Sequence, residues 1–214
     1  MRDSSAGIGT VTYYDPANSC FGGLGHAICD VDTGDILSLM SGEVVDVNIN
    51  GVTKGQKGAP GELRGSFVSR TAMGSLLLNN ETGVFGVMDY CPAENAKAMP
   101  LAMKQEVKTG KATILTTLDG QTPKEYEIRI EKANIGSTNM TKNMVIEVTD
   151  PELLEKAGGI VQGMSGSPII QDGKLVGAVT HVLINDPTKG YGIFAENMYT
   201  FSKDLESNEQ NTAA

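Results

Sequence analysis

Several residue types are scarce in this chain of 214 residues, and each scarcity excludes a class of protein. Tryptophan is absent, and histidine occurs only at His26 and His181. A metal site built from three histidines is therefore excluded, and we expect no cofactor. The 17 Lys and Arg residues are outnumbered by 26 Asp and Glu, which gives a net charge of −9. The basic residues form no cluster, which argues against a nucleic-acid binder.

Long hydrophobic runs and abundant cysteines are also lacking. No run approaches the ~18 apolar residues that a transmembrane helix needs, and the chain does not open on the apolar core of a signal peptide. The three cysteines, Cys20, Cys29 and Cys91, show no metal-ligand spacing, and their odd number leaves at least one thiol outside any disulfide. Whether Cys20 and Cys29 pair stays open, and we interpret the cysteines as buried thiols.

Glycine, in contrast, is abundant, and with the short apolar runs it indicates a β-rich fold. It accounts for 26 of 214 residues, about 12% against a typical ~7%. Runs rich in Val, Ile and Thr between turn residues predict strands. The predicted strands are 7–14, the alternating stretch of Val45, Val47 and Ile49 within 36–49, 74–78, 84–88, 112–118, 125–131, 144–148, 159–161, 168–171, 174–183 and 191–194. They form two successive groups of about six, which suggests two similar β units.

Two irregular segments divide this pattern. Residues 54–65 are rich in turn formers and predict an exposed loop, while 90–100 contains two prolines and is the best linker candidate. We therefore expect an N-terminal β unit over 1–95, a C-terminal β unit over 96–205 and a flexible tail at 206–214.

Short helices and one tight turn complete the expected organisation. Pro151–Lys156 predicts a helix with Asp150 at its N-cap, and residues 196–205 predict a C-terminal helix. Asp172-Gly173 predicts a two-residue hairpin between neighbouring strands.

The sequence Gly-Met-Ser-Gly-Ser-Pro, at 163–168, predicts a serine nucleophile. Gly163 and Gly166 permit a tight turn that exposes Ser165 at its apex. A nucleophile on a chymotrypsin-like barrel requires this form, and the N–H groups of Gly163 and Ser165 would then make the oxyanion hole. Ser167 is a rival nucleophile, but it directly precedes a proline, which extends the backbone there. The alternative is a glycine-rich turn with ordinary serines.

His26 is the candidate general base. It lies in a glycine-rich stretch after a predicted strand of the first β unit, far upstream of Ser165. A base from one unit and a nucleophile from the other give the order of chymotrypsin-like proteases, with histidine first and serine last. A neutral imidazole accepts the hydroxyl proton near pH 7.

His181 lies on the predicted strand that follows the Asp172-Gly173 turn, and two interpretations of its role stay open. In a barrel of this kind the strand lines the primary substrate pocket, with Thr180 beside His181, but a histidine buried in the core is equally consistent. If His181 lines the pocket, replacing it should alter substrate preference more than turnover.

The acidic partner of the base is the least determined residue. Asp89 follows a predicted strand of the first unit, near the place where a chymotrypsin-like fold carries its aspartate. Asp150 also lies between base and nucleophile, but its local sequence predicts a helix cap. The residues themselves leave this choice open.

Four segments resemble the stage IV sporulation protein B (SpoIVB) peptidases of endospore-forming bacteria. They are GIGTVTYYDP (7–16), GGLGHAI (22–28), TDPELLEKAGGIVQGMSGSPIIQDGKLVGAVTHV (149–182) and NDPTKGYGIF (185–194). The resemblance implies an all-β, chymotrypsin-like fold, a double six-stranded antiparallel β-barrel with a short C-terminal helix. It also implies a serine endopeptidase with His26 as the catalytic histidine and Ser165 as the nucleophile. Asp150 matches the aspartate associated with activity in this family, which favours it over Asp89.

The same resemblance implies a location and partners. Family members carry a membrane anchor and a PDZ domain, which we expect in the full-length protein. They act between the forespore and mother-cell membranes, where they cleave themselves and then a membrane-bound regulator, which leads to sigma-factor activation. The expected partner is therefore such a sporulation regulator, with no nucleic acid involved.

Two other functions compete with this interpretation. A barrel without catalysis would bind peptide strands only, but the presence of both His26 and Ser165 favours the peptidase. A cysteine hydrolase is disfavoured, because no cysteine lies at the apex of a turn motif.

Overall fold

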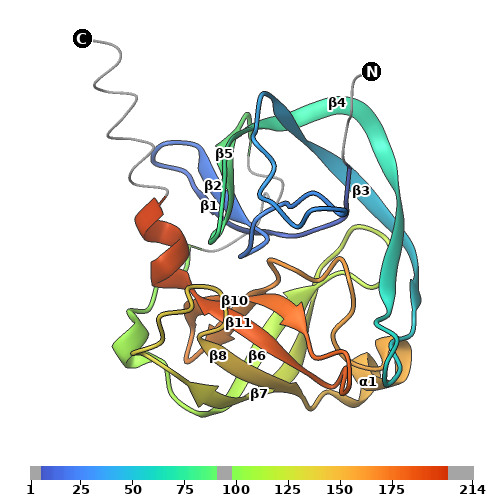
Figure 1. The fold of residues 1–214 in the computed structure, drawn as a ribbon, viewed down its shortest axis with the longest axis vertical. Helices are drawn as coiled ribbons and strands as arrows, with labels where there is room; N and C mark the ends of the chain where they lie inside the picture. Colours follow the sequence, from blue (N-terminus) through green and yellow to red (C-terminus); the bar gives the residue numbers. More distant parts are fainter. Residues whose placement is uncertain (1–5, 91–97, 202–214) are drawn as a thin grey trace.

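The computed structural model describes residues 6–90 and 98–201, which form two β units packed on each other (Figure 1). The first unit is a five-stranded antiparallel sheet in the order β1-β2-β5-β4-β3. Its strands are β1 (Val11–Asp15), β2 (Cys20–Gly23), β3 (Gly42–Thr53), β4 (Glu62–Asn80) and β5 (Gly83–Met88). β2 is buried along its whole length between β1 and β5, so the residues that follow it begin deep in the molecule.

The second unit is a closed six-stranded barrel in the order β10-β11-β8-β7-β6-β9. Its strands are β6 (Gly110–Thr116), β7 (Lys124–Ala133), β8 (Met144–Val148), β9 (Pro168–Gln171), β10 (Lys174–Val182) and β11 (Lys189–Phe194). Along β8 every second residue is buried, the period of a strand with one face on a core. Asp172 and Gly173 have φ values of +52° and +73°, the paired positive φ of the predicted two-residue hairpin between β9 and β10.

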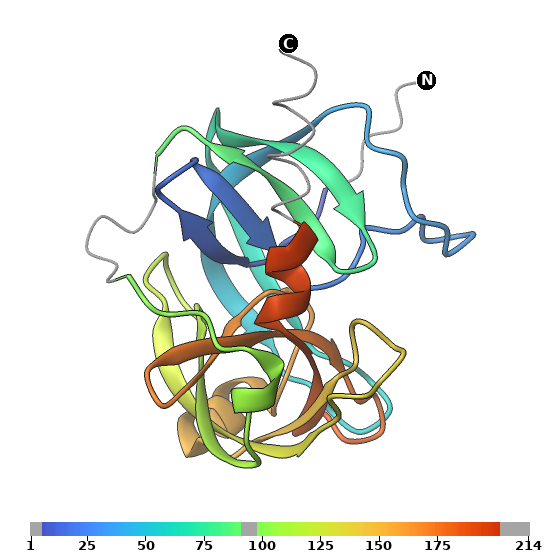
Figure 2. The same ribbon diagram turned by 90° about the vertical axis from the view of Figure 1, so that its left-hand side faces the viewer.

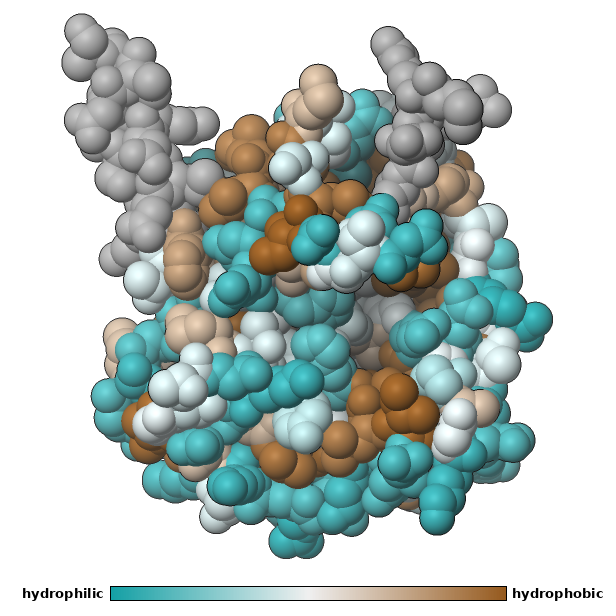
Figure 3. All heavy atoms as spheres, viewed as in Figure 1, coloured by the Kyte–Doolittle hydropathy of each residue, from teal (hydrophilic) through white to brown (hydrophobic). Residues whose placement is uncertain are grey.

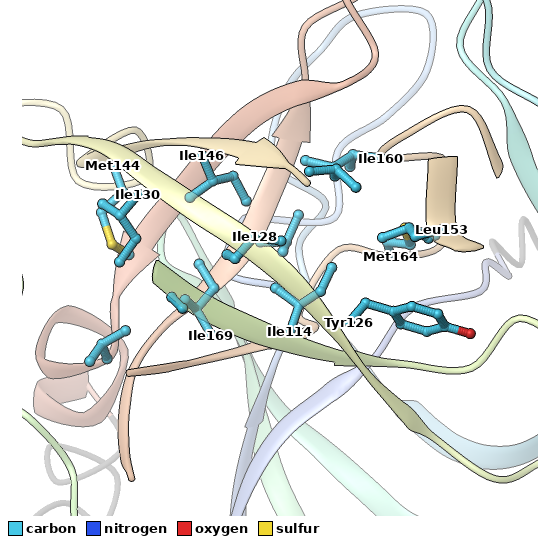
Figure 4. Packing of buried hydrophobic residues seen from close by; sticks show 14 of the residues in the cluster. Ile114, Tyr126, Ile128, Ile130, Met144, Ile146, Leu153, Ile160, Met164 and Ile169 are labelled. Atoms are coloured by element: carbon cyan, nitrogen blue, oxygen red, sulfur yellow. The ribbon is translucent and has the colours of Figure 1, made fainter. Parts of the chain in front are cut away.

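Alternating apolar residues fill the barrel (Figure 4). The fully buried side chains of its core come from strands that are far apart in sequence, and they include Ile114, Ile128, Ile130, Ile146 and Ile169. Burying a side chain of this size contributes roughly 1.5–3 kcal/mol. The barrel is thus the rigid support on which the loops at its rim are held.

The long β3–β4 hairpin joins the first unit to the barrel. It leaves the five-stranded sheet and runs down the side of the molecule towards α1 (Figure 1). Ile49 and Gly120 exchange two backbone hydrogen bonds of 2.8 Å, and the N–H of Leu63 donates to Gln162 O at 2.8 Å. Ile49 and Leu63 are buried in the barrel's own core cluster, so the two units share hydrophobic packing.

Three short helical segments complete the described chain. They are α1 (Pro151–Ala157), the 3₁₀ turn η1 (Lys104–Glu106) and a helix over residues 195–201. The last helix lies against both units (Figure 2), because its Met198 is buried with Phe85 of β5 and with Ala178 and Ile193 of the barrel.

The surface of the molecule mixes hydrophilic and hydrophobic side chains (Figure 3). Among the latter, Val31 and Met40 are almost fully exposed on the loop between β2 and β3. Within residues 6–90 and 98–201, no helix has both the length and the hydrophobicity of a membrane span.

The predicted fold class is confirmed: the chain is all-β with two antiparallel units and a short helix at the C-terminal end. In detail the first unit has five strands and is a half-barrel, while the second is the closed six-stranded barrel. The predicted linker lies largely on residues 91–97, and the tail at 206–214 lies wholly outside the described residues.

The predicted alternating stretch of Val45, Val47 and Ile49 lies within β3, which begins at Gly42, and the apolar residues before Gly42 belong to the exposed loop. Two local predictions were wrong. β4 begins at Glu62, inside the expected loop, and it was missed because Phe67 and its neighbours lie exposed and show no burial alternation. Residues 159–161 are not a strand, although Ile160 and Val161 are buried in the core.

Candidate active site

The turn that carries Ser165 packs directly against the loop that carries His26. Gly166 has φ +89°, and a Cβ there would lie 2.1 Å from Thr10 O and 2.6 Å from the Leu24 nitrogen. Only glycine permits both this backbone conformation and this approach. Leu24 is two residues before His26. The backbone next to the predicted nucleophile is therefore in contact with the backbone next to the predicted base.

Hydrogen bonds hold the Ser165 turn from both units. From the first unit, the N–H of Thr10 donates to Ser165 O at 2.9 Å, and Thr12 Oγ1 donates to Gly166 O at 2.7 Å. From the barrel, Val179 O accepts the Gly166 N–H at 2.8 Å. The position of the serine is therefore set by the interface of the two units.

Two amides of this turn are available to an outside acceptor. Met164 donates its N–H to Val161 O and Gly166 donates to Val179 O, whereas the N–H groups of Gly163 and Ser165 have no acceptor within the described part of the chain. Gly163 has φ +96°, a conformation that favours glycine. These two amides are the pair that the sequence predicts for the oxyanion hole.

Thr180 links the serine to the wall of a neighbouring cleft. The Ser165 hydroxyl donates to Thr180 O at 3.0 Å, and Thr180 Oγ1 donates to Thr141 O at 2.9 Å. The Thr180 side chain is buried, so it supports the cleft wall from behind and does not line the cleft. Ser167, the rival nucleophile, is fully buried and its hydroxyl has no partner among the described residues.

His26 follows β2 on a turn with two positive φ values, +64° at Leu24 and +70° at Gly25. Gly25 packs against the barrel, where a Cβ would lie 2.9 Å from the Thr180 and Ile193 side chains. The Nδ1 of His26 lies 2.8 Å from Ala27 O. A carbonyl oxygen only accepts, so Nδ1 carries the hydrogen and the Nε2 of the neutral ring is left free to accept a proton.

The second histidine of the chain lies next to the first. The ring centroids of His26 and His181 are 5.0 Å apart, and the ring planes are inclined by 39°. Burial, with smaller contributions from His26 and Lys142, lowers the pKa of His181 to about 4. The Nδ1 of His181 is buried without a hydrogen-bond partner among the described residues. His181 is therefore neutral near pH 7.

An open cleft with a volume of about 670 Å³ lies beside the two rings. Its lining comes from the His26 loop, the β4–β5 turn, a loop before β8 and β10: His26, Ala27, Cys29, Ile36, Glu81, Thr138, Asn139, Met140, Thr141 and His181. Glu81 and residues 138–141 were not among the predicted site residues. The run Asn-Asn-Glu-Thr-Gly at 79–83 is typical of a hairpin turn and carried a signal for the first, but nothing in the sequence indicated the second.

The structure does not bring the predicted aspartates to His26. The carboxylate of Asp150 caps α1: one oxygen accepts from the Glu152 and Leu153 N–H groups at 2.9 and 3.1 Å, and the other from Glu127 at 3.2 Å. It does not line the cleft, and its role as the partner of His26 stays a prediction. Asp89 is exposed at the end of β5 and is also absent from the cleft.

No hydrogen bond joins His26 to Ser165: Nδ1 of the ring lies against Ala27 O, and the serine hydroxyl donates to Thr180 O. Of the cysteines, Cys20 is buried and Cys29 exposed, with no disulfide between them. Cys91 lies outside the described residues. In the described ranges no three His, Cys, Asp or Glu side chains are grouped as a metal site.

Two antiparallel β units, one of them a closed barrel, hold a serine turn at their interface, an arrangement typical of serine peptidases. The family model described as SpoIVB peptidase S55 matches residues 1–199. The chain therefore belongs to the SpoIVB peptidase family.

No curated protein sequence shows a significant match. Similar solved structures include the Rv3671c protease of M. tuberculosis in an active form, with 15% identity over 94% of this chain and 91% of that one and a TM-score of 0.43. An inactive serine-to-alanine mutant of Rv3671c has 15% identity, a TM-score of 0.44 and coverage of 69% and 71%.

Proposed function

We propose that this peptidase cleaves internal peptide bonds through an acyl-enzyme on Ser165, with His26 as general base. One observation carries the proposal: the glycine at 166 lets the Ser165 turn touch the backbone of the His26 loop across the interface of the two units. The tautomer that Ala27 O imposes on His26 supports it, because Nε2 is then free to accept the hydroxyl proton.

The proposed reaction has two halves. Ser165 Oγ leaves Thr180 O, passes its proton to His26 Nε2 and attacks the substrate carbonyl carbon. The N–H groups of Gly163 and Ser165 then bind the oxyanion, and His26 returns the proton to the leaving nitrogen as the C–N bond breaks. Water, activated by the same imidazole, hydrolyses the ester and releases the acid product. A single oxyanion donor contributes roughly 3–4 kcal/mol in other serine proteases.

Labelling with a fluorophosphonate probe tests this assignment. We expect the wild-type chain to be labelled at Ser165 and to cleave unfolded protein substrates, and both activities to disappear in Ser165→Ala. His26→Gln should slow labelling by several orders of magnitude. Ser167→Ala is the matched control, since it removes a buried hydroxyl that has no partner among the described residues, and it should label like the wild type.

One feature favours a second candidate, a barrel that binds peptides without cleaving them: Ser165 donates to Thr180 O and not to His26. Absence of labelling and of cleavage in the wild-type chain, together with saturable binding of an extended peptide, would establish that function instead.

We also propose, on the family membership, that the protein is a signalling protease of sporulation. It would act outside the cytoplasm, between the forespore and mother-cell membranes, on itself and on a membrane-bound regulator. A membrane anchor and a PDZ domain would belong to the full-length protein. In the host cell, Ser165→Ala should abolish both autocleavage and heat-resistant spores, and normal sporulation of that strain would refute this role.

A further inference from the structure

One wall of the cleft beside His26 and His181 is a segment without strand pairing. Residues 138–141 line the cleft and belong to the loop between β7 and β8. Within the described part of the chain, no hydrogen bond joins the backbone of this segment to another backbone group. Its carbonyl groups must therefore find other partners, and these partners decide the shape of the wall.

Three successive carbonyl oxygens of this segment each accept a hydrogen bond from a side chain that lies outside it. The pairs are Asn139 O with Asn143 Nδ2 at 2.8 Å, Met140 O with Asn197 Nδ2 at 3.2 Å and Thr141 O with Thr180 Oγ1 at 2.9 Å. The donors come from the residue before β8, from the helix over residues 195–201 and from β10. The wall is thus attached to the rest of the molecule by side chains, at three consecutive residues.

Asn143 is firmly held among these donors. It is only 4% exposed, and its own N–H donates to Gly192 O of β11 at 2.9 Å. Its Oδ1 accepts from the Phe194 N–H at 3.4 Å and from Asn197 Nδ2 at 3.0 Å. A backbone N–H can only donate, so Oδ1 faces Phe194 and Nδ2 is directed at Asn139 O. The amide therefore has a single orientation, in which it joins β11 and the C-terminal helix to the wall.

We infer that Asn143 and Asn197 are positioning residues of the peptidase, whose side-chain amides hold residues 138–141 in the shape that binds the peptide substrate. The inference rests on the proposed function, because it takes the cleft beside His26 as the substrate site. Neither asparagine lines the cleft, so both act through the segment that does.

The nucleophile has a separate support. Thr10 and Val179 hold the Ser165 turn through backbone hydrogen bonds that do not involve residues 138–141. A change at Thr180 would affect both wall and nucleophile, since its carbonyl accepts the Ser165 hydroxyl, whereas changes at the two asparagines release the wall alone. Such a release should weaken substrate binding and leave the chemical step largely intact. KM should therefore rise while kcat changes little, the pattern of lost ground-state binding.

The test compares Asn143→Ala with Gln171→Ala in the full chain. Gln171 is the matched control, since it is also a buried amide of the barrel with three side-chain hydrogen bonds, to backbone groups of Lys108 and Lys111, and these residues do not line the cleft. Urea unfolding should show similar losses of stability in the two variants. On an extended peptide substrate, Asn143→Ala should raise KM about tenfold and change kcat less than about threefold, whereas Gln171→Ala should keep the wild-type KM.

Asn197 supplies an independent variant in case Asn143→Ala does not fold. Asn197→Asp keeps the size of the side chain but turns a carboxylate oxygen towards Met140 O and Asn143 Oδ1, which are both acceptors. It should therefore raise KM at least as far as Asn197→Ala. If the side chain only filled space, the aspartate variant would keep the wild-type KM.

A KM within about twofold of the wild type in both Asn143→Ala and Asn197→Asp would overturn the inference, as would a loss confined to kcat. Fluorophosphonate labelling separates this result from failure of the proposed function, because the small probe reports on Ser165 without filling the cleft. If the wild type labels at Ser165 while the variants keep its KM, the positioning role alone fails. If the wild type does not label, both fail.

Discussion

The imidazole rings of His26 and His181 lie 5.0 Å apart although they come from different β units. Two cationic rings at this distance would repel each other. Burial lowers the pKa of His181 to about 4. In the proposed mechanism the positive charge therefore resides on His26, and His181 stays a neutral wall of the cleft.

The first prediction concerns stability at acid pH. The unfolded chain protonates His181 near pH 6.5 and the folded chain only near pH 4, so between these values the unfolded state binds more protons. The free energy of unfolding should thus fall as the pH falls from 6.5 to 4. The full shift corresponds to about 3 kcal/mol, and we expect about 1–2 kcal/mol because the ring is partly exposed to solvent.

Urea unfolding of the wild type and of His181→Phe at pH 7 and pH 4.5 measures this effect. The phenylalanine ring fills the same space but does not titrate, so the variant should lose less stability on acidification. Equal losses in the two proteins would contradict the assignment.

The second prediction concerns substrate selection. Because neutral His181 lines the cleft next to the base, His181→Phe should change which residues are accepted near the scissile bond and should change kcat on the best substrate less than about tenfold. Cleavage of a peptide library, analysed by mass spectrometry, measures both. An unchanged cleavage pattern would exclude a role in specificity.

Much of the fold could be predicted from sequence, and the failures have physical causes. β7 and β8 of the closed barrel bury every second residue along much of their length, and such alternation is visible in the sequence. The early part of β4 could not be found, because the side chains of residues 64–69 are exposed on both faces of a ribbon and carry no apolar period. β3 and β4 also contact the other unit through Ile49 and Leu63, a long-range arrangement that no local pattern encodes.

The candidate site, too, could be predicted from the sequence only in part. Ser165 could be picked out because its flanking glycines are a local requirement of backbone geometry, and Gly163 and Gly166 indeed have positive φ. A cleft lined by Glu81 and Thr141 depends on which loops meet in space. For Asp150 the local physics and the family resemblance pointed in different directions, and the structure places it at the helix cap.

The third prediction separates these two roles of Asp150. Asparagine caps a helix almost as well as aspartate, whereas alanine does not. If capping is its function, Asp150→Ala should lose about 1 kcal/mol of stability, and Asp150→Asn should keep both stability and activity. Thermal unfolding and kcat/KM of the two variants decide the point, because a catalytic carboxylate would make the asparagine variant stable but nearly inactive.

The fourth prediction tests the contact between the Ser165 turn and the His26 loop. In Gly166→Ala the new Cβ would lie 2.1 Å from Thr10 O and 2.6 Å from the Leu24 nitrogen, so these backbones must move apart. We expect a loss of more than about 3 kcal/mol of stability, from the clash together with the strain at φ +89°. Activity at a temperature where the variant remains folded should fall at least as steeply, because the movement separates nucleophile and base.

Gly173→Ala is the matched control for this experiment. Gly173 has φ +73°, but a Cβ there would meet nothing within 4 Å. This variant carries the backbone strain without the clash and should lose only about 1 kcal/mol while keeping its activity. If the two variants were equally stable and equally active, the close approach of Gly166 to Leu24 would not be what holds the serine beside the histidine.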